Sequence, residues 1–203
     1  MGSNMKKRSR AKAAAADAGY AIRELVLDDV AEVYALGERL FTAEKWPTLY
    51  RSWDQYEVVQ LFDSDGEFCL VAETEHRIVG FALGTLMEKY GSPWRYGWLL
   101  WLGISQRYRG RGIAARLLKR LAERFIEHGA RIMLVDTDAE NAQALRFFRK
   151  QGFGNDLMHV YLSRNFEEHP SYIERRARKK RIRSLRRRRL LGSRLARGKR
   201  SKR

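Results

Sequence analysis

The segment ISQRYRGRGIA, residues 104–114, has the residue types and spacing of a phosphate-binding loop. It follows the apolar run WLLWLG and precedes apolar residues at helical spacing, so it would join a strand to the start of a helix. The first amides of a helix have no partner within the helix, and the helix dipole favours negative charge there. The context therefore predicts a site for an anion such as a phosphate.

Two kinds of residue in this loop suit a phosphate. Gly110 and Gly112 let the backbone approach a ligand without Cβ obstruction, and the three arginines of RYRGR can donate charge-assisted hydrogen bonds. The loop lacks the GK[ST] ending of a nucleoside-triphosphate P-loop and the three-glycine pattern of a dinucleotide site. The alternative is a basic, solvated turn that happens to contain glycines.

Two motifs resemble one known family. RYRGRG at 107–112 is similar to the [QR]xxGx[GA] acyl-CoA loop of the Gcn5-related N-acetyltransferases (GNAT), and NAQALRFFRKQGF at 141–153 is similar to that family's next motif, NxxAxxxYxxxGF. The resemblance covers about residues 20–165. It implies an acyltransferase, specifically an acetyltransferase, that uses acetyl-CoA as its acyl donor.

The resemblance also implies how acetyl-CoA is held. Backbone amides of the loop would bind the pyrophosphate, the pantetheine arm would pair with the strand before the loop, and an asparagine side chain would bond the same arm. The expected acetyl-CoA-binding residues are Leu102, Ile104, Arg107, Arg109, Gly110, Arg111, Gly112, Ile113, Ala114, Asn141 and Phe148.

Acetyl transfer from a thioester needs a neutral amine and a group that removes its proton. In strand alternation Asp136 shares a face with Ile132 and Leu134 and would project where the strand ends. In the amino-terminal and ribosomal-protein branch of the family, the matching position carries an acid that helps to deprotonate the amine. An aspartate is a weak base, so it would act through water or after partial burial. The alternative is that Asp136 only caps or solvates the strand end.

The proton donor is where the chain departs from the family pattern. The position usually occupied by a tyrosine is Phe148, which cannot donate a proton and is most simply a core residue packed against the pantetheine arm. Tyr161 is the first candidate to protonate the leaving thiolate, and Tyr108 or water are alternatives. A further alternative is that the chain binds acyl-CoA without turning it over quickly.

Substrate choice is expected in two irregular segments that mix aromatic and charged residues, FTAEKWPTLYRSW and EKYGSPWRY. Glu44 and Glu88 in these segments could attract a cationic amine, or they are ordinary surface acids. His76 and His159 have no partners at metal-ligand spacing, so no metal site is expected.

The elements that must position these residues follow from periodicity and turn signals. Strands are expected at 20–26, 67–74, 77–87, 95–105, 131–138 and 156–163, and helices at 29–40, 52–62, 111–127 and 142–151. The order βααβββαβαβ predicts an α/β fold, in the manner of GNAT proteins, with a mixed, mostly antiparallel sheet flanked by helices. Segments 98–105 and 132–138 would be adjacent parallel strands, the second buried on both faces.

Charge divides the chain unevenly. Residues 171–203 hold 17 Lys and Arg against one acid, Glu174, while the first 170 residues hold 24 basic and 23 acidic residues. We therefore expect a disordered basic amino terminus over 1–19, a domain over 20–165 and a basic, Arg-rich tail over 166–203. The tail should stay disordered until it meets a polyanion, with RNA or DNA the natural partner. A solubilising or targeting tail and an anionic membrane are the alternatives.

The only cysteine, Cys69, lies in a strand-like apolar stretch, and no apolar run reaches the roughly 20 residues that span a bilayer. A cytoplasmic location is expected.

The sequence predicts an acetyl-CoA-dependent N-acetyltransferase that modifies a primary amine of a protein, either the N-terminal amine or a lysine. Its basic tail is expected to associate with nucleic acid or the ribosome. The alternatives are an acyl-CoA-binding regulatory protein associated with nucleic acid and a small-molecule amine acetyltransferase.

Overall fold

The structure, a computed structural model, describes residues 19–42, 53–88, 91, 93–157, 160, 162 and 164–200, with side chains described as far as residue 185. The chain divides into two units, Met1–Gly154 and Asn155–Arg203, and each is described by itself. The expectations for residues 1–18, Glu44, His159 and Tyr161 lie outside the described residues.

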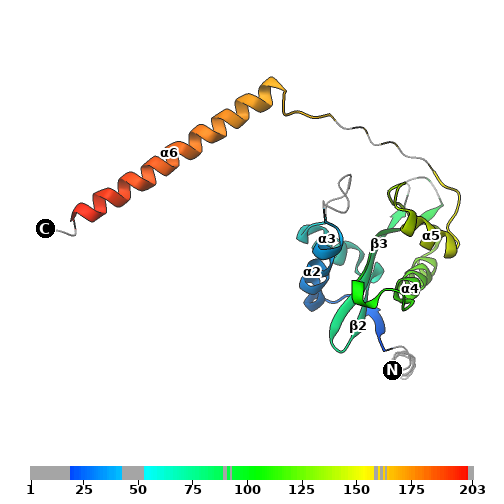
Figure 1. The fold of residues 1–203 in the computed structure, drawn as a ribbon. Helices are drawn as coiled ribbons and strands as arrows, with labels where there is room; N and C mark the ends of the chain where they lie inside the picture. The colour runs from blue at the N-terminus through cyan, green and yellow to red at the C-terminus, as the bar shows by residue number, and fades with distance from the viewer. Residues whose placement is uncertain are drawn as a thin grey trace. The chain divides into compact units, whose positions relative to one another are not determined.

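The first unit is built on a five-stranded sheet with the order β1-β2-β3-β4-β5 (Figure 1). The first three neighbouring pairs are antiparallel, and β4 and β5 are parallel. This mostly antiparallel mixed sheet with flanking helices confirms the predicted fold class. The strands are Ala21–Glu24 (β1), Cys69–Thr74 (β2), Arg77–Glu88 (β3), Arg95–Ile104 (β4) and Ala130–Val135 (β5).

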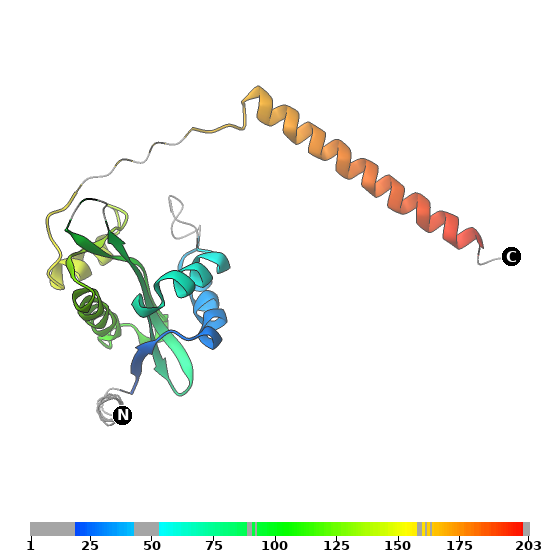
Figure 2. The same cartoon turned by 180° about the vertical axis from the view of Figure 1, so that it is seen from behind.

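Helices cover both faces of the sheet, as the two opposite views show (Figures 1 and 2). On one face α2 and α3 pack over a cluster that contains Phe81 and Trp101. On the other face α4 and α5 enclose a cluster that contains Phe68, Phe125 and Phe148. The helices are Val30–Leu40 (α2), Gln55–Asp65 (α3), Ile113–Glu127 (α4) and Ala142–Lys150 (α5), with short 3-10 turns at Leu27–Asp29 (η1), Gly66–Phe68 (η2) and Gln106–Tyr108 (η3).

Strands β2 and β3, both predicted from the sequence, form an antiparallel hairpin. Its two-residue turn, Glu75 and His76, has φ values of 46° and 62°, and positive φ at both central residues is the geometry that tight hairpins require. Helix α3 differs from its prediction because it begins after Asp54, whose carboxylate accepts the amides of Tyr56 and Glu57, and continues through Asp65.

Asp29 ties the start of the chain to the first helix. Its carboxylate accepts hydrogen bonds from both terminal nitrogens of Arg23, at 2.5 and 2.8 Å, and from the amide of Val26 at 2.9 Å. Burial alone would raise the pKa of Asp29, but the bonds from Arg23 and Val26 outweigh it and hold this pKa below its ordinary value. Asp29 is the N-cap residue of α2, but its side chain makes no capping hydrogen bond to that helix and forms this clamp instead.

Two expectations about the last strands are wrong. The prediction of burial on both faces fails for β5, because β5 is an edge strand of the described sheet and Ile132 is 37% exposed. A strand over 156–163 is not formed at the positions described there, where Leu157, Val160 and Leu162 are exposed. An apolar run between polar turns has the same pattern at an edge and in the centre of a sheet, so the sequence could not separate these cases.

In the second unit, Pro170–Arg200 forms one helix, α6, of 31 residues. The sequence predicts a tail without structure of its own, and the structure differs because Arg, Lys, Leu and Ala all have high intrinsic helix propensity. Every side chain described in α6, from Pro170 to Leu185, is exposed. Within the described residues, no helix has the length and apolar character that crossing a membrane requires.

Candidate functional site

The loop before α4 has the backbone of an anion-binding turn. Gly110 and Gly112 have φ values of 77° and 76°, a conformation that side chains disfavour, and only open space lies within 4 Å of the Cβ positions they lack. Gly112 is the N-cap of α4, and the helix starts with no side-chain cap and no acid in its first turn. Among the described residues, no acceptor is found for the amides of 110–114. These donors and this space fit a phosphate.

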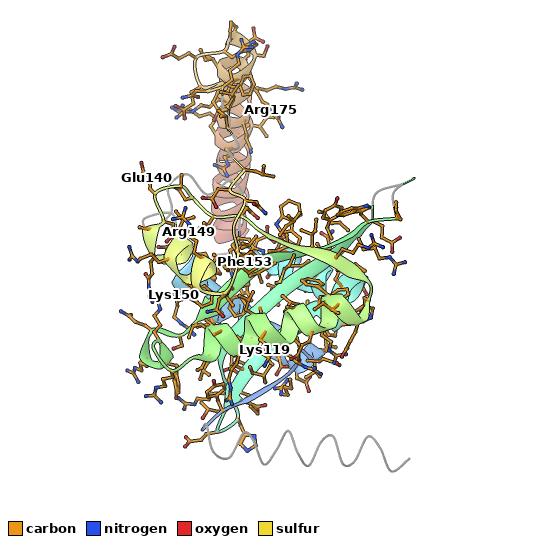
Figure 3. All side chains as sticks on the ribbon, turned by 90° about the vertical axis from the view of Figure 1, so that its right-hand side faces the viewer. Lys119, Glu140, Arg149, Lys150, Phe153 and Arg175 are labelled. Atoms are coloured by element: carbon orange, nitrogen blue, oxygen red, sulfur yellow. The ribbon has the colours of Figure 1, made fainter. Side chains whose placement is uncertain are left out.

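The loop is also positively charged. Arg107, Arg109 and Arg111 are exposed, and the guanidinium of Arg111 lies over the ring of Tyr108 at 5.0 Å from its centroid. Ile113 is buried in the core, so it can offer a ligand only its backbone. Further cationic side chains lie on the neighbouring helices, where Figure 3 labels Lys119 on α4 and Arg149 and Lys150 on α5.

Strand β4 continues past the end of β5 close to this loop, and we call this place, where β4 has no β5 partner, the opening between β4 and β5. Their parallel pairing runs from Arg95 with Ala130 to Leu99 with Val135, yet β4 continues to Ile104. An extra residue in β4, Leu100, shifts its register with β3 at the same level. Leu102 and Ile104 therefore lie beyond the last β5 partner, and their backbone can pair with an extended ligand that enters between the strands. Their side chains pack on the core beneath.

Asp136 lies at the point where the two strands part. It follows directly after β5, it is exposed, and its Oδ1 accepts a hydrogen bond from the indole Nε1 of Trp98 at 2.8 Å. Trp98 is on β4, paired with Leu134 of β5. The predicted catalytic acid is thus held across the start of the opening between β4 and β5.

Asn141 and Phe148 lie on α5. Asn141 is the N-cap, since its Oδ1 accepts the amide of Ala144 at 3.1 Å and its Nδ2 donates to Thr137 at 3.1 Å. One N–H of the carboxamide has no bond in these contacts and is the atom that suits a ligand carbonyl. Phe148 is 8% exposed and packs edge-on against Phe147 and Phe153, which confirms it as a core residue.

The structure brings together the glycine loop, Leu102, Ile104, Asp136 and Asn141, because all of them follow or end the parallel strands β4 and β5. It does not bring Glu88 to the same place. Glu88 ends β3 and pairs with Arg95 at 2.8 Å, at the opposite end of β4 from the loop. No group of three or more metal-ligating side chains occurs in the part of the chain that the structure describes.

Two features of the site were not predicted from the sequence. Trp98 sits in an apolar strand, where a tryptophan looks like any core residue, and nothing in the pattern marks its bond to Asp136. The extra residue at Leu100 was hidden because all five residues of WLLWL are apolar and fit either register. A break in strict alternation at Leu99 and Leu100 was the available signal.

A family comparison matches residues 38–153 to the model of the acetyltransferase (GNAT) family. The match spans more than half of the chain and includes the glycine loop, Asp136 and α5. This chain belongs to the GNAT acetyltransferase family. It is an N-acetyltransferase whose acyl donor is acetyl-CoA, and the resemblance first seen in RYRGRG is confirmed.

Solved GNAT structures share the fold at low identity. The aminoglycoside acetyltransferase AAC(6')-Iy with a CoA bisubstrate analogue is 18% identical, with a TM-score of 0.58 over 72% of this chain and 98% of that one. An aminoglycoside acetyltransferase from an uncultured soil metagenomic sample, in complex with sisomicin, is 20% identical, with a TM-score of 0.58 over 73% and 99% of the two chains. The glucosamine-6-phosphate N-acetyltransferase of Arabidopsis thaliana is 20% identical, with a TM-score of 0.54 over 72% and 98%.

Proposed function

We propose that this GNAT enzyme transfers the acetyl group to a primary amine of a protein, either the N-terminal amine or a lysine, in the cytoplasm. We propose further that its basic tail associates with nucleic acid or the ribosome. The observation that carries the catalytic part is the position of Asp136, a carboxylate at the opening between β4 and β5 on the same end of the sheet as the glycine loop.

Different residues of the site bind different parts of acetyl-CoA. Acetyl-CoA supplies the activated thioester when it is bound. The amides of 110–114, which have no acceptor among the described residues, suit its phosphates, and Arg107, Arg109 and Arg111 add positive charge. The backbone of Leu102 and Ile104, beyond the last β5 partner, orients the pantetheine arm, and the remaining N–H of Asn141 bonds the same arm.

The proton acceptor is Asp136. An exposed carboxylate is a weak base towards an alkylammonium, so it takes the amine proton through a bridging water and attracts the cationic acceptor by its charge. Tyr161, outside the described residues, remains our proposed proton donor to the thiolate. Phe148 cannot take that role, because it is buried and has no acidic proton.

The distribution of charge on α6 favours nucleic acid as the partner of the tail. Seven basic residues between Arg175 and Arg183 project from a helix that turns 100° per residue, so exposed cations occur on all its sides. A membrane would require one apolar face, which this arrangement does not provide. Phosphates that surround the helix from several directions, as in a nucleic-acid groove or a folded RNA, match this distribution better. A polyanion-binding tail favours a protein acceptor that resides beside nucleic acid.

A small-molecule amine is the second candidate acceptor. It is favoured by the structural neighbours, two of which are aminoglycoside acetyltransferases. Glu88 does not favour either candidate, since its carboxylate is paired with Arg95.

The test is acceptor-dependent release of free thiol from acetyl-CoA by the full-length protein. Peptides, ribosomal proteins, polyamines and aminoglycosides are compared with a no-acceptor control. Cys69 does not interfere with thiol reagents, because it is fully buried and burial raises its pKa to about 12. Preference for proteins or peptides, with the acetyl group located by mass spectrometry, supports the proposal. Preference for polyamines or aminoglycosides overturns it in favour of the second candidate.

A further inference from the structure

The hydrogen bond between Trp98 and Asp136 joins the two strands whose separation forms the site. Trp98 precedes the last β4–β5 residue pair, Leu99 with Val135, and Asp136 is the first residue after it. We propose that Trp98 is a positioning residue for acetyl transfer, whose indole N–H fixes the Asp136 carboxylate at the opening between β4 and β5. This inference rests on the proposed role of Asp136 as proton acceptor.

The face on which Trp98 lies is fixed by its neighbours. Trp98 pairs with Thr85 of β3, and Thr85 donates a hydrogen bond to Asp65, at the end of α3, at 2.8 Å. The adjacent Gly97 lies against Phe125 of α4, on the other face. Trp98 is therefore on the α2 and α3 face of the sheet.

Asp136 lies on that same face of the sheet. Met133 and Val135 of β5 pack against the α4 side, so alternation places Leu134 and Asp136 on the side of α2 and α3. The glycine loop opens α4 on the opposite face. The bond from Trp98 thus holds the carboxylate on the side of the sheet away from the α4 core, where an acceptor amine can approach without crossing the phosphate-binding loop.

An indole orients a carboxylate and weakens it as a base less than a cationic side chain would. A carboxylate at the end of a strand can rotate about two side-chain torsions, and a fixed donor selects one arrangement. The indole N–H carries no formal charge, so it orients Asp136 without neutralising it as an arginine or lysine would. Trp98 is half-buried on a paired strand, which gives the donor a rigid base.

The first test is Trp98→Phe, which keeps a ring on β4 and removes the donor. Loss of one such bond should lower kcat by about fivefold to tenfold while KM for acetyl-CoA stays unchanged. The acidic limb of the kcat profile should move to higher pH, because a carboxylate that loses a hydrogen bond has a higher pKa. Thr85→Val is the matched control, since Thr85 pairs with Trp98 and donates its hydroxyl to Asp65 rather than to Asp136, and it should leave both quantities unchanged.

The second test reads the bond directly and does not need the Trp98 variant to be active. The indole N–H resonance of Trp98, assigned by its absence in Trp98→Phe, should shift with pH in the wild-type protein and lose that shift in Asp136→Asn. A pH shift that persists in Asp136→Asn, or that is absent from the wild type, overturns the positioning role.

The two proposals fail differently. If Asp136→Asn retains full turnover, Asp136 is not the proton acceptor. The proposed mechanism is then wrong, even if the indole resonance shows that Trp98 bonds Asp136 in the wild-type protein. If Asp136→Asn loses turnover while Trp98→Phe matches the wild type in kcat and in its acidic limb, only the positioning role of Trp98 is overturned.

Discussion

Gly112 shows at the scale of a single residue how the loop depends on a backbone conformation. Its φ of 76° lies where a Cβ costs about 1–2 kcal/mol, and the space beside it is open to a ligand. Gly112→Ala should lower the free energy of unfolding by about that amount and raise KM for acetyl-CoA by about tenfold. Both are measured by urea denaturation and steady-state kinetics.

Gly129 is the matched control for this prediction. It ends α4 with a φ of 81°, and an added Cβ would meet only Arg95 at an ordinary contact distance of 3.7 Å. Gly129→Ala should cost similar stability and leave KM for acetyl-CoA at its wild-type value. An equal rise in KM in both variants would show that strain in α4, rather than the loop, controls binding.

Some features of the candidate site could be predicted from the sequence, and others could not. The loop was predicted because glycines and arginines between an apolar run and a helix are unusual, and Asn141 because it opens the second motif that resembles the GNAT family. The bond from Trp98 to Asp136 was not, because it joins positions 38 residues apart that only strand register brings together.

At the scale of the elements, the Arg23–Asp29 clamp connects β1 to the turn before α2. Asp29→Asn should lower the free energy of unfolding at pH 7 by about 1–3 kcal/mol, because Arg23 loses one of its two carboxylate partners and keeps only Glu73. The folded-state pKa of Asp29 is depressed, so the stability it adds is present above its unfolded pKa of about 3.9 and is lost as pH falls through the folded pKa.

The wild type and Asp29→Asn should therefore differ in urea denaturation at pH 7 and converge in acid. Asp28→Asn, at the exposed neighbouring position, is the control and should match the wild type throughout. A constant difference between Asp29→Asn and the wild type at every pH would show that the clamp stabilises by shape rather than by charge.

The elements with strong local patterns were predicted well. Strands β2, β3 and β4 alternate or run apolar between turn residues, and α4 has an apolar stripe that ends at a glycine. The errors lie where local pattern competes with long-range partners. A strand at 156–163 needs a neighbour that the sequence does not specify. The tail has too little apolar surface to bury, which predicts disorder, yet its residues have high intrinsic helix propensity and form α6.

At the scale of the whole molecule, the unequal charge of the two units predicts a strong effect of salt. A nucleic-acid complex formed through about six to ten phosphate contacts should lose about 10³- to 10⁵-fold in affinity between 50 and 200 mM salt. Fluorescence anisotropy with labelled duplex RNA and duplex DNA measures this for the full-length protein. Affinity that is insensitive to salt would exclude the basic helix α6 as the binding element.

The most direct test of the account compares the full-length enzyme with a form that ends at Asn165. The measurement is kcat/KM on a short soluble peptide and on the same acceptor sequence within its protein bound to nucleic acid. We predict that truncation leaves the value for the peptide unchanged and lowers the value for the bound acceptor at physiological salt. If truncation changes kcat/KM on neither acceptor, α6 has no part in selecting the substrate. If truncation abolishes activity on both acceptors, catalysis and nucleic-acid binding do not belong to separate units.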